Sequence, residues 1–189
     1  IHMLSTSRAV APLGGIAPVF GTDPIAFGVP STRGPIIFDM GTSAFMQTEL
    51  FLRARRGEEL PEDVGIDALG QPSRDPAQVK LGALLPFGGH KGYGLAFMMQ
   101  AFGVLAGSGL DPEKENACLF IVFKPDLLMD LEQFKREVTQ LVDRVKSTPR
   151  QPGVDEIRIP SERAFREREK LSREGIVIDK LVYDLLIAL

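Results

Sequence analysis

The sequence predicts a protein of the α+β class. Strand-like segments are grouped in the early part of the chain, whereas amphipathic helical patterns dominate the later part. Strands and helices do not alternate in the regular βαβ order that builds a parallel sheet. The chain has 189 residues, of which 44% are hydrophobic, and this suffices for a well-formed core.

The predicted strands are short apolar segments rich in β-branched and aromatic residues, bounded by turn residues. A loop at residues 31–34 connects two of them, and Asn116 and Pro125 bound a third. A shorter strand is expected directly before Pro160. The expected strands are residues 1–4, 25–30, 35–40, 117–123 and 157–159.

The predicted helices follow from apolar spacing and from capping residues. Ser43 is a plausible N-cap for the first helix and Gly57 ends it, while Ser161 and Gly175 bound a strongly charged later helix. Residues 57–80 are polar and are expected to form a loop. The expected helices are residues 43–56, 95–105, 131–145, 161–173 and 179–186.

A glycine-rich segment at residues 84–96 surrounds the pair His90-Lys91 and leads into an apolar helix. Such a loop, with a lysine and a helix N-terminus behind it, suits a phosphate or carboxylate. Its spacing matches neither a P-loop nor a Rossmann fingerprint. The alternative is a glycine-rich turn at the start of a core helix, with Lys91 solvated and His90 packed. Both interpretations stay open from the local sequence.

Composition excludes several classes of protein. The net charge of −3 argues against nucleic acid as the main partner. One cysteine, Cys118, excludes an intrachain disulfide framework, and two histidines do not make a zinc cluster. No apolar run approaches the roughly 20 residues of a membrane span, and no signal peptide is recognised. We therefore expect a cytoplasmic protein without a bound metal or a membrane partner.

Four segments, in this order along the chain, resemble a known family. They are residues 21–27 (GTDPIAF), 38–43 (FDMGTS), 84–96 and 160–163 (PSER). Together they resemble the malate/L-lactate dehydrogenase family that is distinct from the Rossmann-type dehydrogenases, over essentially the whole chain. The resemblance implies a largely antiparallel sheet with flanking helices. It also implies a homodimer whose site lies near the subunit interface, and hydride transfer between NAD or NADP and an α-keto acid, α-hydroxy acid or cyclic imino acid.

The resemblance also implies a set of cofactor-binding residues. Asp39 is in addition expected to support catalysis, by hydrogen-bonding a ribose or amide or by orienting the catalytic base, although it could be a helix-capping or turn carboxylate instead. The expected cofactor contacts are Thr6, Asp39, Met40, Gly41, His90, Lys91, Gly92 and Ser161.

The chain also departs from the family pattern. The family's catalytic histidine and its substrate-carboxylate residues lie upstream of the segment that matches residue 1, and neither His2 nor His90 matches that role. Residues 1–189 are thus expected to be the cofactor-binding domain and C-terminal helices of a longer or split family member. The N-terminal catalytic half would then be absent, and the partner a second copy or a chain carrying that half.

Two further departures concern charge. Asp23 stands where the family usually has asparagine, and Thr48-Glu49 stands where Gly-Lys is usual. These motivate a second hypothesis, a non-catalytic binding or scaffold protein that kept the family fold.

Overall fold

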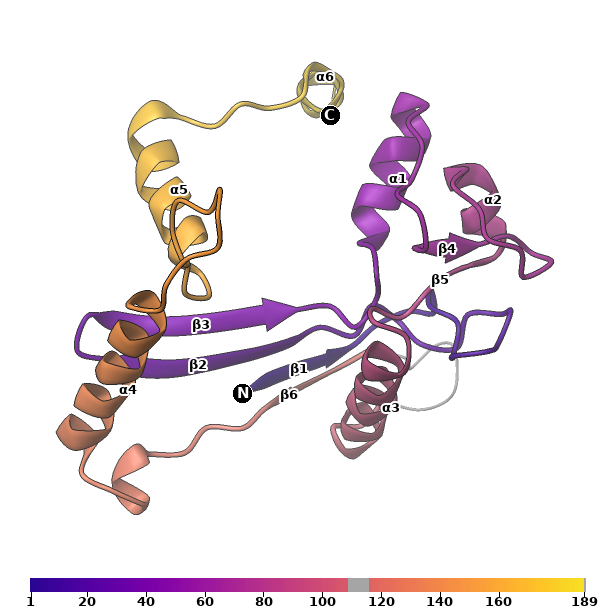
Figure 1. Cartoon of the computed structure of the whole chain (residues 1–189). Helices are drawn as coiled ribbons and strands as arrows, with labels where there is room; N and C mark the ends of the chain where they lie inside the picture. The colour runs from indigo at the N-terminus through magenta and orange to yellow at the C-terminus, as the bar shows by residue number, and fades with distance from the viewer. Residues whose placement is uncertain (109–115, 189) are drawn as a thin grey trace. The chain divides into compact units, whose positions relative to one another are not determined.

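The computed structural model describes residues 1–108 and 116–188 (Figure 1). The chain forms two compact units. The first comprises Ile1–Gly28 and Asp39–Lys124, and the second comprises Val29–Phe38 and Pro125–Leu189. Two of the three unit boundaries, between residues 28 and 29 and between residues 38 and 39, fall inside strands.

The regular elements follow one another in mixed order, as Figure 1 shows. The strands are β1 (His2–Ser5), β2 (Ile25–Ser31), β3 (Gly34–Met40), β4 (Gly65–Ile66), β5 (Ala83–Leu84) and β6 (Ala117–Phe120). The helices are α1 (Gln47–Arg56), α2 (Pro76–Leu81), α3 (His90–Leu105), η2 (Pro125–Leu127), α4 (Leu131–Lys146), α5 (Glu162–Glu174) and α6 (Lys180–Ile187).

The main sheet has four strands in the order β3-β2-β1-β6, and β4 and β5 form a separate two-stranded sheet. Strand β1 pairs antiparallel with both of its neighbours, so that Met3 lies opposite Ile25 on β2 and Leu119 on β6. The pair β4–β5 is also antiparallel. The α+β class with a largely antiparallel sheet is therefore confirmed.

Alternation along β1 decides which face of the sheet is covered in the first unit. Met3 and Ser5 are buried, whereas His2 and Leu4 are only half-buried, as the two-residue period of a strand requires. Met3 packs with Ile25 and with Met99 of α3, the helix that lies against β1 and β6. Helix α3 therefore covers one face of this part of the sheet.

A second and larger core lies under α1 and α2, which stand side by side in the first unit (Figure 1). Its side chains come from the segment between β1 and β2, from α1, α2 and the segment between them, and from β5 and α3. The buried members are Val10, Phe20, Leu50, Leu60, Val64, Val79, Leu84 and Ala96. Since residues 57–80 supply three of these, that segment is a folded part of the core.

In the second unit, α4 packs on the turn between β2 and β3. The buried Thr139 hydroxyl lies 2.8 Å from the Thr32 hydroxyl and accepts the Thr32 backbone N–H at 3.1 Å. One turn further along α4, Asp143 forms a two-pronged ion pair with Arg33 at 2.7 and 2.9 Å. These polar contacts tie the hairpin turn to the helix.

Several predicted boundaries are wrong. Ser43 does not cap α1, because the helix begins at Gln47 after Met46 and the Ser43 hydroxyl donates to the Phe45 carbonyl instead. The segment 57–80 is not only loop, since Asp75 caps α2 by accepting the Ala77 N–H at 2.8 Å and Pro76 begins the helix.

The later part of the chain holds further corrections. Helix α3 begins at His90 and not at residue 95, so His90 and Lys91 belong to its first turn. Strand β6 ends at Phe120, and residues 157–159 form no strand. Helix α5 does start after Ser161, but the Ser161 hydroxyl makes no capping bond. The expected C-terminal helix and α4 are confirmed.

Gly92 and Gly94 offer a direct test of packing at the start of α3. A Cβ atom at Gly92 would lie 2.5–2.6 Å from backbone atoms of Phe87 and Thr42, whereas one at Gly94 would meet nothing within 4 Å. We expect Gly92→Ala to lower the unfolding free energy by about 1–3 kcal/mol, because backbone atoms cannot move aside as side chains do. Gly94→Ala should raise it by about 0.5–1 kcal/mol. Urea unfolding of the two variants measures both values, and equal effects would contradict the packing described.

Candidate functional site

A hollow of about 710 Å³ lies in the first unit, between the end of β3 and the start of α1. Most of its surface is apolar, with hydroxyl, amide and carboxylate groups interspersed. Its lining residues are Thr22, Pro24, Asp39, Met40, Gly41, Ser43, Ala44, Phe45, Met46, Gln47, Thr48 and Glu49. An apolar hollow with a few polar groups is the usual form of a small-molecule site.

The floor of the hollow is held by hydrogen bonds between two chain segments. The buried Thr42 donates from its N–H (2.8 Å) and from its hydroxyl (3.1 Å) to the carbonyl of Thr22. A Cβ atom at Gly41 would lie 3.2 Å from the same carbonyl, so the two backbones approach closely there. The segment Asp39–Met40–Gly41, predicted from the sequence, is thus fixed at the edge of the hollow.

The first turn of α1 forms the opposite wall. No side chain caps this helix, so its first N–H groups lack an intrahelical acceptor and give that end a partial positive charge. Glu49 lies in this turn and accepts a hydrogen bond from Arg53 Nε at 3.2 Å, in an i,i+4 ion pair. The Arg53 guanidinium also lies 5.4 Å from the centre of the Phe45 ring, which lines the hollow.

The glycine-rich segment is hydrogen-bonded to the backbone of residues 42–44, next to the hollow. Phe87 donates its N–H to the Thr42 carbonyl at 3.1 Å, and Ala44 donates to the Leu85 carbonyl at 2.7 Å. Gly92 is buried against this junction, where a Cβ atom would collide with the backbones of Phe87 and Thr42. His90 and Lys91 are exposed in the first turn of α3 and do not line the hollow.

Asp23 is a fully buried carboxylate directly beside the hollow, between the lining residues Thr22 and Pro24. Its Oδ1 accepts the Thr6 N–H at 2.8 Å and the Thr6 hydroxyl at 3.3 Å, while its Oδ2 accepts from Gln100 Nε2 at 3.0 Å. Burial raises the pKa of Asp23 above its usual value, although the hydrogen bonds from Thr6, Gln100 and Gly21 oppose that shift.

Apart from His90 and Lys91, which are exposed outside the hollow, the predicted residues divide into three groups. Asp39, Met40 and Gly41 line the hollow itself. Thr6 and Gly92 do not line the hollow but contact residues next to its lining. Thr6 donates to Asp23, and Gly92 lies against the backbone of Thr42. Ser161 belongs to the second unit, where its hydroxyl donates to the Ile37 carbonyl.

Sequence reasoning missed the wall that α1 contributes. Phe45, Met46 and Gln47 line the hollow and were not predicted to do so, while Thr48 and Glu49 were noted only as departures in charge. The available signal was their position just after FDMGTS, where a strand ends and a helix begins. The predicted helix start at residue 43 hid this signal, because Phe45, Met46 and Gln47 were then expected inside the helix and not at its beginning.

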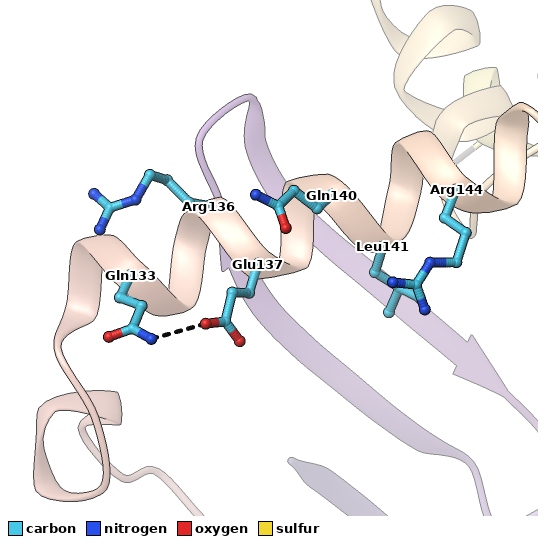
Figure 2. A pocket seen from close by; sticks show the side chains of 6 residues that line it. All are labelled: Gln133, Arg136, Glu137, Gln140, Leu141 and Arg144. Atoms are coloured by element: carbon cyan, nitrogen blue, oxygen red, sulfur yellow. Dashed lines mark hydrogen bonds between the residues drawn. The ribbon is translucent and has the colours of Figure 1, made fainter.

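Another hollow, of about 380 Å³, lies along the second unit's helix α4. Figure 2 shows that all the side chains lining it come from this one helix: Gln133, Arg136, Glu137, Gln140, Leu141 and Arg144. Glu137 accepts a hydrogen bond from Gln133 at 2.8 Å, and charges of both signs alternate along the face. Since no second element encloses a ligand, this is an ordinary solvated helix surface.

Residues 1–108 and 116–188 show neither of two other kinds of site. No helix there is long and apolar enough to cross a membrane. Within the same residues, no three His, Cys, Asp or Glu side chains gather in a group that could hold a metal ion.

Comparison with known proteins identifies the family. A family model described as malate/L-lactate dehydrogenase matches residues 1–187. The chain therefore belongs to the malate/L-lactate dehydrogenase family.

Individual relatives agree with this assignment. The malate/(S)-sulfolactate dehydrogenase of Methanothermus fervidus is 39% identical over 98% of this chain and 57% of its own length. A Δ(1)-pyrroline-2-carboxylate/Δ(1)-piperideine-2-carboxylate reductase of Pseudomonas putida is 36% identical over 94% of this chain and 54% of its own. A solved dehydrogenase structure from Sinorhizobium meliloti superposes with a TM-score of 0.90 at 28% identity, over 99% of this chain and 58% of that one. The chain thus spans just over half the length of these relatives.

The buried carboxylate of Asp23 predicts a specific pH dependence. Because its folded pKa lies above the unfolded value, the folded state holds this proton more firmly. The unfolding free energy of the wild type, relative to Asp23→Asn, should therefore fall as pH rises through the acid range and level off above the folded pKa. Urea unfolding of both proteins between pH 4 and 7 measures this difference, in which the other titrating groups cancel. A relative stability that rises with pH would contradict it.

The hydrogen-bonding role of Asp23 has its own test. Asp23→Asn can keep the bond from Thr6, and rotation of the Gln100 amide restores the second. Asp23→Ala leaves the donors on the half-buried Thr6 and Gln100 without an acceptor and should cost about 1–3 kcal/mol. Thermal unfolding at pH 7 compares the two variants, and equal losses would show that these acceptor bonds do not contribute.

Proposed function

We propose that this chain is the nicotinamide-binding part of an NAD- or NADP-dependent oxidoreductase. The enzyme would act on an α-keto acid, an α-hydroxy acid or a cyclic imino acid. The observation that carries the proposal is the hollow lined by Asp39, Met40 and Gly41, in a chain of this family. The names of the relatives support this substrate range, because they include dehydrogenases of hydroxy acids and reductases of cyclic imino acids.

The hollow has the chemistry that one end of a dinucleotide requires. Phe45, Met40 and Met46 offer apolar surface for a planar ring, and the Asp39 carboxylate offers an acceptor for ribose hydroxyls. Gly41 allows its backbone to lie close to the Thr22 carbonyl, which holds the main chain at the edge of the hollow. The nicotinamide, when bound, supplies the hydride chemistry. Asp39 would hold the ribose and so orient the attached ring. We also propose cofactor contacts at Thr6, His90, Lys91, Gly92 and Ser161.

General acid catalysis at a carbonyl or imine needs a proton donor near neutral pKa within hydrogen-bond reach. His2 and His90 are the chain's histidines, and neither lines the hollow. We propose that the acid comes from polypeptide corresponding to the remaining length of the relatives, in the same protein or in a partner. We further propose that the working assembly is a homodimer or a complex with such a chain.

Binding and turnover should therefore separate in this chain. The 189 residues alone are expected to bind reduced nicotinamide cofactor, as seen by a change in nicotinamide fluorescence, but not to oxidise it with pyruvate or a cyclic imino acid. Adding the family's complementary half should restore turnover. Robust turnover by the 189 residues alone would refute the need for a partner segment.

Asp39→Ala should weaken cofactor binding about tenfold or more, since a hydrogen bond to a charged group is lost. Asp155→Ala, at an exposed position of the second unit, is the matched control and should leave binding unchanged. Equal Kd values for the wild type and Asp39→Ala would show that Asp39 does not contribute to cofactor binding.

The alternative is a non-catalytic binding or scaffold protein. The Asp23 departure that motivated it does not require it, because Asp23 is fully hydrogen-bonded within the fold. A chain that binds neither NADH nor NADPH, and regains no activity with a complementary half, would favour this alternative.

A further inference from the structure

Away from the hollow, a thiol and an imidazole meet on the main sheet. The Sγ atom of Cys118 on β6 lies 3.2 Å from the Nε2 atom of His2 on β1, within hydrogen-bonding distance. The strand register brings them together: His2 lies opposite Phe120 and Leu4 opposite Cys118, so His2 and Cys118 are diagonal neighbours on antiparallel strands. Neither residue lines the hollow, so the proposed function does not use this pair.

The ring of Phe120 holds the imidazole in place. The two rings stack with their centroids 4.4 Å apart and their planes inclined by 13°. Stacking restricts rotation of the His2 ring and keeps Nε2 directed at the sulfur. An activated nucleophile needs a base within hydrogen-bond reach and a third group that orients the base. Cys118, His2 and Phe120 supply these three parts.

Reagents in solution can reach the thiol. Cys118 is exposed, and it projects from the face of the sheet opposite to the one that α3 covers. The Ile1 amino group, the nearest charge in the sequence, donates to the Ile121 carbonyl. The neighbouring side chains on this face are uncharged: Leu4, Ala26 and Phe120. Among the described residues, His2 is thus the basic group that contacts the thiol.

We propose that Cys118 is a nucleophilic thiol that exchanges reversibly with low-molecular-weight disulfides, and that His2 is the base that takes its proton. In this exchange the proton moves from Sγ to Nε2, and the thiolate attacks one sulfur of the disulfide. A new S–S bond forms at Sγ as the old one breaks, and the leaving thiolate takes the proton from the imidazolium. The products are a mixed disulfide at Cys118 and one free thiol. This inference is independent of the proposed function.

The test follows one residue, because the chain has a single cysteine. The folded 189-residue chain is treated with glutathione disulfide, and intact mass measures the addition of one glutathione per chain. At pH 7 the wild type should react about threefold or more faster than His2→Gln, because an unassisted thiol is only a few per cent ionised there. Near pH 10, where thiols ionise without a base, the two rates should converge. Dithiothreitol should remove the added group.

Phe120→Ala separates the action of a base from simple exposure. Removing the ring uncovers the thiol, so exposure alone predicts a faster reaction, whereas release of the His2 ring predicts a slower one. Unfolding in guanidinium chloride provides the matched control. His2 and Cys118 are 116 residues apart along the chain, so the unfolded wild type and unfolded His2→Gln should react at the same rate.

Three results would overturn the inference. They are equal rates of the folded wild type and His2→Gln at pH 7, a faster reaction of Phe120→Ala, and a difference between wild type and His2→Gln that persists after unfolding. Circular dichroism shows which variants keep the fold, and where one does not, the rate of the other decides. None of these results bears on cofactor binding, so the proposed function is tested separately.

Discussion

The first unit depends on one buried carboxylate. Asp23 joins the turn after β1, through Thr6, to helix α3, through Gln100, and both partners donate to it. A buried charge is tolerated only when donors surround it, so these contacts determine where the neighbouring backbone lies. Thr22, the preceding residue, then presents its carbonyl to Thr42. That hydrogen bond positions the backbone beside the hollow. The contacts of Asp23 therefore help to set the geometry of the site.

The same arrangement explains why the glycine-rich segment matters although it does not line the hollow. Thr42 donates from its N–H and its hydroxyl to the Thr22 carbonyl, and its own carbonyl accepts the Phe87 N–H. Gly92 allows α3 to approach this junction, because a side chain there would collide with backbone atoms. The local sequence left two interpretations open, an anion site and a glycine-rich turn at the start of a core helix. The observed turn and the exposed Lys91 agree with the second, but His90 is exposed and not packed as that interpretation expects. The proposal of a cofactor contact at Lys91 is compatible with it, since Lys91 is exposed.

Departures from the family pattern acquire a physical meaning once they are placed in the fold. Asp23 is buried and accepts hydrogen bonds within the fold, so its role is structural. Glu49 stands instead on an open wall, where its charge is available to a ligand. The two residues that add negative charge therefore lie in different environments, Asp23 buried and hydrogen-bonded and Glu49 on the open wall of the hollow.

The sequence by itself determined the α+β class, the β2–β3 hairpin, the helix α4 and the family, because apolar periodicity and ordered motifs are local properties of the chain. It also pointed to Asp39, Met40 and Gly41, which do line the hollow. Only the tertiary structure decided the start of α1 at Gln47 and of α3 at His90, since those helix ends are set by packing and backbone hydrogen bonds from distant segments. It likewise decided that Glu49 faces the hollow and that Asp23 is buried. Burial and charge environment depend on residues far apart in the sequence, and local patterns do not contain them.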